Sequence, residues 1–175
     1  MDITVRAKTH SATTGKLSIG KYIFDCTLGA HGLIAEAQKV EGDKKTPLGE
    51  YPLRYLLYRA DRRTAPPTDL PLKILTPQTG WCEDPAHPDY NREITLPHAA
   101  VCDKMTRDDH LYDYTVVLGH NDSPPIAGKG SAIFMHLARH DFTPTAGCIG
   151  LKEADLLEVL KLCGRSSKIK IMFDE

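Results

Sequence analysis

The sequence predicts a mostly β protein with long loops and one or two helices. Much of the chain alternates apolar and polar residues in short stretches that glycines interrupt, as strands of a half-buried sheet do. Near the C-terminus, one stretch instead repeats its apolar residues at helical spacing. The chain has 175 residues and shows no repeat, low-complexity tract or linker. We therefore expect residues 1–175 to form one domain with a sizeable core.

The strand patterns occur along the whole chain. The expected strands are residues 3–5, 21–26, 51–55, 113–118, 131–136 and 168–173. Residues 33–40 are short and fit either a helix or a strand. Residues 152–163 fit a helix better, because their apolar residues form one stripe and Gly164 follows where a helix often ends.

Two segments are expected to be long exposed loops. Residues 59–71 combine charges with several prolines, and residues 80–97 contain Trp81 among further prolines. The densest basic run, residues 59–63, lies in the first of them, where it is expected to be solvated.

Charge and cysteine content argue against several classes of protein. The 22 basic and 23 acidic residues leave a formal net charge of −1, which gives no basis for binding nucleic acid or an anionic membrane. The N-terminus lacks the apolar region of an export signal, so we expect a cytoplasmic protein. The five cysteines are widely spaced without a CxxC pair, which favours reduced thiols over a disulfide framework or a zinc site.

The segment 130–151 carries the strongest chemical signal. It places His136 at the end of an apolar run and Gly147-Cys148 twelve residues later. An imidazole within hydrogen-bond reach is the commonest way to activate a thiol at neutral pH, and a glycine lets the backbone approach a substrate carbonyl. The alternative is a core cysteine and an unrelated histidine. A zinc pair formed by His136 and His140 is disfavoured, because Asp141–Pro144 opposes the helix it needs.

These residues resemble the YkuD-type L,D-transpeptidase catalytic domain family. Its signature is a histidine, a spacer of about a dozen residues, and Ser/Thr-x-Gly-Cys before an apolar residue; His136 and Thr145–Ile149 fit this pattern. Further similar segments are residues 41–49, 80–85, 90–92, 111–113 and 119–122. The resemblance covers essentially the whole chain.

The resemblance implies a β-sandwich or barrel-type fold and a cysteine acyl-enzyme that acts on peptidoglycan stem peptides. Cys148 would attack the carbonyl between meso-diaminopimelate and D-Ala, and His136 would serve as general base and acid. The Leu137 backbone carbonyl would orient the imidazole, and the Gly147 N–H would help to bind the oxyanion. This chemistry requires no metal or cofactor, and we expect a monomer.

One departure concerns the substrate contacts. Many members carry an arginine two residues after the nucleophile, where this chain has Gly150. A guanidinium for substrate carboxylates is then expected from Arg139 or Arg92, although both also fit as solvated loop charges. Further candidates for the substrate groove, or for simple packing, are Trp81, His120 and Tyr112. Of these, His120 also competes with His136 as the base.

The absence of an export signal bears on the acceptor. In the cytoplasm no polymer is available for cross-linking, so the thioester is expected to react with water. The sequence thus predicts an L,D-carboxypeptidase that releases D-Ala from muropeptides during peptidoglycan recycling. The alternatives are a periplasmic L,D-transpeptidase that forms cross-links or exchanges D-amino acids, and a non-catalytic muropeptide-binding module.

Overall fold

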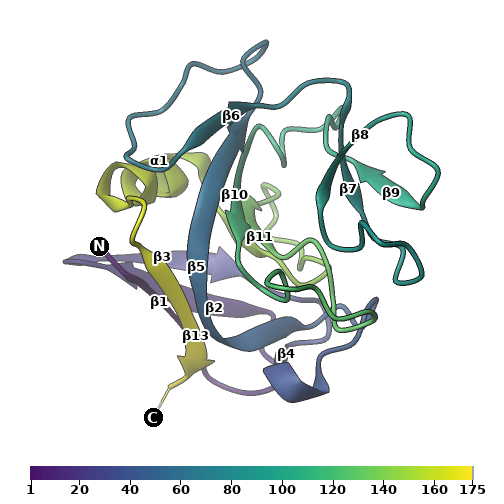
Figure 1. The fold of residues 1–175 in the computed structure, drawn as a ribbon. Helices are drawn as coiled ribbons and strands as arrows, with labels where there is room; N and C mark the ends of the chain where they lie inside the picture. The colour runs from purple at the N-terminus through teal and green to yellow at the C-terminus, as the bar shows by residue number, and fades with distance from the viewer. Residues whose placement is uncertain (175) are drawn as a thin grey trace.

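The computed structural model describes residues 1–174 and shows a strongly curved sheet built around one long strand, β5 (Figure 1). The sheet runs in the order β10-β11-β12-β3-β2-β1-β13-β5-β4, and β6 pairs with β5. Because β10 also pairs with β5, the sheet closes on itself as a barrel. Its strands are β1 (Ile3–Ala7), β2 (Thr14–Ile19), β3 (Tyr22–Thr27), β4 (Leu33–Ala35), β5 (Thr46–Tyr58), β6 (Leu72–Ile74), β10 (Tyr114–Leu118), β11 (Phe134–Leu137), β12 (Ile149–Leu151) and β13 (Lys168–Phe173).

A second sheet of three strands stands beside this barrel, at the right of Figure 1. It has the order β8-β7-β9, with β7 (Thr79–Cys82), β8 (Glu93–Thr95) and β9 (Cys102–Lys104). The described chain has one α-helix, α1 (Glu153–Leu162), and a three-residue 3-10 turn, η1 (Glu36–Gln38).

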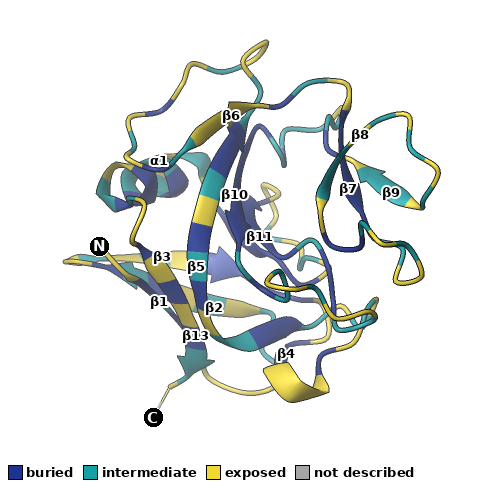
Figure 2. Ribbon diagram, viewed as in Figure 1, coloured by how far each residue is buried: buried dark blue, intermediate teal, exposed yellow. Residues whose placement is uncertain are grey.

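The core follows from the two-residue period of the strands. Parallel pairing of β1 with β13 sets Ile3 opposite Ile169 and Val5 opposite Ile171, and all four side chains are buried. The helix α1 adds its buried face to the same cluster through Leu156, Val159 and Leu160. Figure 2 shows the resulting contrast between buried barrel strands and exposed loops.

The expected strands and the C-terminal helix are confirmed, with shifted ends. Residues 33–40 were expected to be either helix or strand, but they contain both the strand β4 and the 3-10 turn η1. The expectation of a loop over residues 80–97 was wrong, because β7 and β8 lie within it. Both strands are short, and nearby prolines made a loop the expected structure. Burial of Trp81 and Cys82 against the rest of the protein stabilises the pairing of β7 with β8.

The basic run at residues 59–63 lies in a loop, as expected, with Ala60, Asp61 and Arg62 exposed, but two of its arginines are also ion-paired to a buried carboxylate. Asp113, whose side chain is only 4% exposed, accepts hydrogen bonds from Arg62 Nη1 at 3.3 Å and Arg63 Nε at 2.9 Å. Arg63 also pairs with Glu153 of α1 at 3.1 Å. Asp113 directly precedes β10, so these contacts join the loop after β5 to the barrel and the helix.

We predict that Asp113→Asn lowers the free energy of unfolding by about 1–3 kcal/mol, because two half-exposed guanidiniums lose a buried ionic partner. Urea denaturation measures the change. The matched control is Asp61→Asn, which breaks the pair between Arg59 and a carboxylate that is 60% exposed and should leave the midpoint unchanged. Equal losses in both variants would contradict a special role for Asp113.

Candidate active site

The parallel pairing of β11 with β12 brings the nucleophile candidate beside the histidine. His136 lies opposite Gly150 in this register, and Met135 lies opposite Ile149. Cys148, one residue before β12, therefore reaches the start of β11, where its Sγ accepts the Phe134 N–H at 3.3 Å. The residues between the two strands only have to form the return connection.

Cys148 and His136 line the same cavity, which has a volume of about 210 Å³. Its wall also includes Tyr112, Arg107, Arg139 and Thr145. The structure thus brings together five of the residues singled out in the sequence: Cys148, His136, Leu137, Tyr112 and Arg139.

The His136 ring has a defined tautomer. Its Nδ1 lies 2.8 Å from the Leu137 carbonyl, which can only accept, so Nδ1 carries the proton and Nε2 carries the lone pair. Burial lowers the pKa of His136 to about 4, so the ring is neutral at pH 7. The Leu137 carbonyl therefore holds the imidazole in the form of a general base.

Cys148 is buried and hydrogen-bonded through its sulfur. Besides accepting the Phe134 N–H, Sγ lies 3.2 Å from the Ala132 carbonyl, to which the thiol donates. Burial raises the pKa of Cys148 to about 12, so the resting group is a thiol rather than a thiolate. Attack by this sulfur requires a base to take its proton during the reaction.

The turn before Cys148 is held by the Thr145 hydroxyl. This group donates to the Cys148 carbonyl at 2.6 Å and accepts the Gly147 N–H at 3.1 Å. Gly147 has φ +135°, and a Cβ there would lie 2.9 Å from the Lys45 carbonyl oxygen, so a side chain is excluded. In this structure the Gly147 N–H expected to face an oxyanion is engaged by Thr145.

Asn91 links the three-stranded sheet to the nucleophile. Its Oδ1 accepts the Trp81 indole N–H and the Ala132 N–H, each at 3.0 Å. The carbonyl of Ala132 is the acceptor for the Cys148 thiol. Trp81 itself packs edge-on against Phe134, with ring centroids 4.9 Å apart, and does not line the cavity. The sequence marked the segment around Asn91 but not this role, which depends on contacts distant along the chain.

The remaining candidates occupy other places. Arg92 is exposed and lines a separate hollow with Trp81. His120 is buried, with Nε2 3.2 Å from the Lys129 carbonyl and its ring edge-on to Tyr51. It does not line the cavity that holds Cys148.

The sequence reasoning missed Arg107, which lies between β9 and β10. Its guanidinium lies 5.1 Å from the centroid of the Tyr112 ring, and that ring stands 5.2 Å from the His136 ring. Gly150, by contrast, has no room for a side chain, because a Cβ would lie 2.5 Å from Cγ2 of Thr27. Positive charge in this cavity therefore comes from Arg107 and Arg139.

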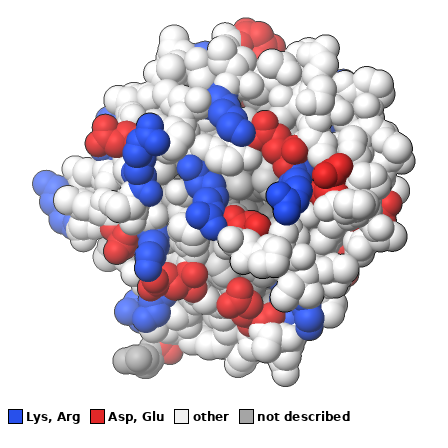
Figure 3. All heavy atoms as spheres, viewed as in Figure 1, with Lys and Arg blue, Asp and Glu red and all other residues white. Residues whose placement is uncertain are grey.

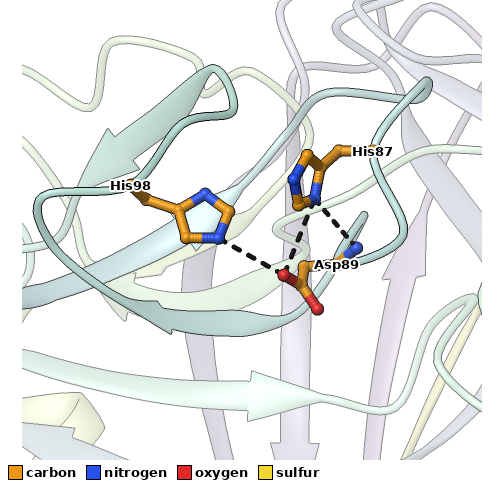
Figure 4. A group of neighbouring side chains, drawn as sticks. All are labelled: His87, Asp89 and His98. Carbon is orange, nitrogen blue, oxygen red and sulfur yellow. Dashed lines mark hydrogen bonds and ion pairs between the residues drawn. The ribbon is translucent and has the colours of Figure 1, made fainter.

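One group of side chains has the composition of a metal site. Ligand atoms of His87, Asp89 and His98 lie within 4.8 Å of one another (Figure 4). Nδ1 of His87 accepts the Asp89 N–H at 3.1 Å, and Nδ1 of His98 accepts the Ala100 N–H at 3.2 Å. The proton of His98 is then on Nε2, which donates to Asp89 at 3.3 Å. We therefore interpret these three side chains as a hydrogen-bonded group that stabilises its own loop, outside the cavity that contains Cys148.

The face shown in Figure 3 carries interspersed positive and negative side chains. Among the described residues, no helix is both long and apolar enough to cross a membrane.

Comparison with known proteins agrees with this geometry. The family model described as L,D-transpeptidase catalytic domain, YkuD, matches residues 3–171. Searches of curated proteins and of solved structures gave no match. With nearly its whole length matched, the chain belongs to the YkuD family of L,D-transpeptidase catalytic domains.

Proposed function

We propose that this protein is a cytoplasmic L,D-carboxypeptidase that releases D-Ala from peptidoglycan tetrapeptides during recycling. The observation that carries the proposal is a buried thiol in the same cavity as an imidazole whose tautomer leaves Nε2 free to accept a proton. Family membership supports peptidoglycan peptides as the substrate class.

In the first half of the reaction, Cys148 Sγ attacks the carbonyl of the diaminopimelate–D-Ala bond while His136 Nε2 takes the thiol proton. The tetrahedral oxyanion forms beside the Cys148 N–H, with the Gly147 N–H as a second donor once it leaves the Thr145 hydroxyl. His136 then protonates the leaving amine, D-Ala departs and a thioester remains. Since thiol and imidazole both start neutral, the proton moves with the attack rather than before it.

In the second half, His136 takes a proton from water as the water attacks the thioester. The intermediate collapses, the proton returns to sulfur and a tripeptide with a free carboxylate leaves. Water is the favoured acceptor in this proposal because the cavity of about 210 Å³ is small for two peptide strands. The five free thiols fit a reducing compartment, where soluble muropeptides rather than cross-linkable polymer are present.

Incubation with disaccharide-tetrapeptide, followed by mass spectrometry, tests the proposal. We expect loss of one D-Ala by hydrolysis, and a decrease in rate of about 10³-fold or more in Cys148→Ala, because no other group replaces the nucleophile. Cys102→Ser removes a thiol outside the cavity and serves as the matched control.

Other outcomes of that experiment would overturn the proposal. Exchange of D-Ala for an added D-amino acid without net hydrolysis would identify a transpeptidase. Undiminished function in Cys148→Ala, with no carbapenem adduct at Cys148 in the wild type, would identify a binding module.

The pH profile of kcat/KM tests the assignment of His136. Because burial lowers the pKa of His136 to about 4, the base stays neutral as pH falls through 6.5, and activity should decline only as pH approaches 4. An ordinary exposed histidine would give a decline near pH 6.5. His120→Ala should keep the shape of the profile, and an altered acid limb in that variant would assign the base to His120 instead.

A further inference from the structure

We infer that Arg107 binds the terminal carboxylate of the leaving D-amino acid and so makes the enzyme an exopeptidase. This inference rests on the proposed function, because it names the contact that selects the substrate of the same site. It concerns a residue with no chemical role in the mechanism above.

Arg107 and His136 line the same cavity and lie near the same Tyr112 ring. The Tyr112 ring centroid lies 5.1 Å from the Arg107 guanidinium carbon and 5.2 Å from the His136 ring centroid, so the two groups are no more than about 10 Å apart. In the leaving D-Ala, the amine and the carboxylate carbon are about 2.5 Å apart. Hydrogen bonds of about 3 Å at either end then let one residue span from His136 to Arg107. In the leaving D-Ala, the amine would lie at His136, which protonates it, and the carboxylate on the same Cα would lie at Arg107.

Asp109 accepts hydrogen bonds from two of the three nitrogens of the Arg107 guanidinium. Arg107 Nε and Nη2 donate to the two Asp109 oxygens at 2.9 and 2.8 Å, and Asp109 also accepts the Leu111 N–H at 3.2 Å. Within residues 1–174, no hydrogen bond from Arg107 Nη1 is formed. Asp109 is therefore a positioning residue that fixes the guanidinium plane and leaves one edge for a ligand.

The local charge also favours an anion. Arg139 Nη2 lies 3.9 Å from the same Asp109 carboxylate, so two guanidiniums of the cavity wall lie near this carboxylate. The Arg107 side chain is 32% exposed, which leaves it partly desolvated yet reachable from the cavity. A substrate carboxylate would accept a charge-assisted hydrogen bond from Arg107 there.

This arrangement predicts selection by the position of the carboxylate. A tetrapeptide ends one residue after the scissile bond and places its carboxylate at Arg107. A pentapeptide places it one residue further away and should be a poorer substrate.

The experiment compares wild type, Arg107→Gln and the control Arg92→Gln on a tetrapeptide and on its C-terminal amide. We expect the amide to lower kcat/KM of the wild type by about 10- to 100-fold, the range for a lost charge-assisted hydrogen bond. Arg107→Gln should show a similar loss on the acid and little further loss on the amide. Arg92→Gln should behave as wild type, and Arg107→Lys should recover part of the loss on the acid.

Equal losses of Arg107→Gln on both substrates, or a wild type that does not distinguish them, would overturn the inference. Thermal melting of each variant identifies a failure to fold, in which case Arg107→Lys and the acid-to-amide ratio of the wild type decide. A wild type that releases no D-Ala from either peptide would overturn the proposed function itself, which is a different result.

A separate observation points to a modification site in the three-stranded sheet. We propose that Cys82 and Cys102 form a disulfide when the protein meets an oxidised low-molecular-weight disulfide. Cys82 lies directly opposite Cys102 in the antiparallel register of β7 and β9. The backbone bond from Glu83 N to Val101 O, 3.1 Å, is next to this pair, and the bond from Met105 N to Thr79 O, also 3.1 Å, lies three positions away on the other side. The alternation of an antiparallel ladder makes Cys82–Cys102 a non-hydrogen-bonded pair, with Cα atoms about 4.5 Å apart, a separation that a disulfide can span.

The reaction is an ordinary thiol–disulfide exchange. Cys102, the more exposed of the two, attacks oxidised glutathione as a thiolate and releases one reduced glutathione. Cys82 then displaces the second glutathione from Cys102, so two protein thiols become one disulfide and one glutathione disulfide becomes two thiols. The new bond would join β7 to β9, on the sheet whose Trp81 packs beside Cys148.

Mass spectrometry of the Cys148→Ala protein after incubation with oxidised glutathione tests this site without the nucleophile. We expect a mass loss of about 2 Da, a peptide linking Cys82 to Cys102 and a melting temperature higher by several degrees. Cys82→Ser should instead retain glutathione on Cys102. A stable glutathione adduct on the protein that keeps Cys82, or unchanged free thiols in it, would overturn the proposal.

Discussion

The parallel pairing of β11 with β12 is the constraint on which the site depends. It sets His136 opposite Gly150, two residues after Cys148, although His136 and Cys148 are twelve positions apart along the chain. Barrel closure through β10 and β5 fixes β11 in turn, because β10 pairs with both. Strand pairing in the barrel therefore determines the relative positions of His136 and Cys148. The connection between β11 and β12 only has to supply the turn at Gly147.

A second set of contacts reaches the nucleophile from outside the barrel. Trp81 of the small sheet and Ala132 donate hydrogen bonds to the same Asn91 oxygen. The Ala132 carbonyl in turn accepts a hydrogen bond from the Cys148 thiol. Tyr112, in the wall of the cavity, lies close to both His136 and Arg107. The proposed substrate contact and the proposed nucleophile are thus held by different segments, so a change at one need not disturb the other.

The sequence allowed much of this to be predicted where local patterns decide the outcome. Alternation identified most of the barrel strands but not β2, β6 or β12. The glycine before Cys148 marked a backbone turn that no other residue fits. The small sheet was missed because its strands are only three or four residues long and depend on burial of Trp81. Arg107 and Asn91 were missed for a related reason, because their roles depend on neighbours that are distant in sequence. The sequence around an arginine in a charged loop does not show whether its side chain faces a cavity.

The neutral state of Cys148 has a consequence for the durability of the enzyme. Peroxide and alkylating agents react with thiolates, and a buried thiol with a pKa near 12 presents almost none at neutral pH. Reactivity would arise only while a substrate carbonyl and the imidazole are both in place. In the proposed mechanism, burial of Cys148 would therefore keep the sulfur unreactive between turnovers and make it nucleophilic only while substrate is bound.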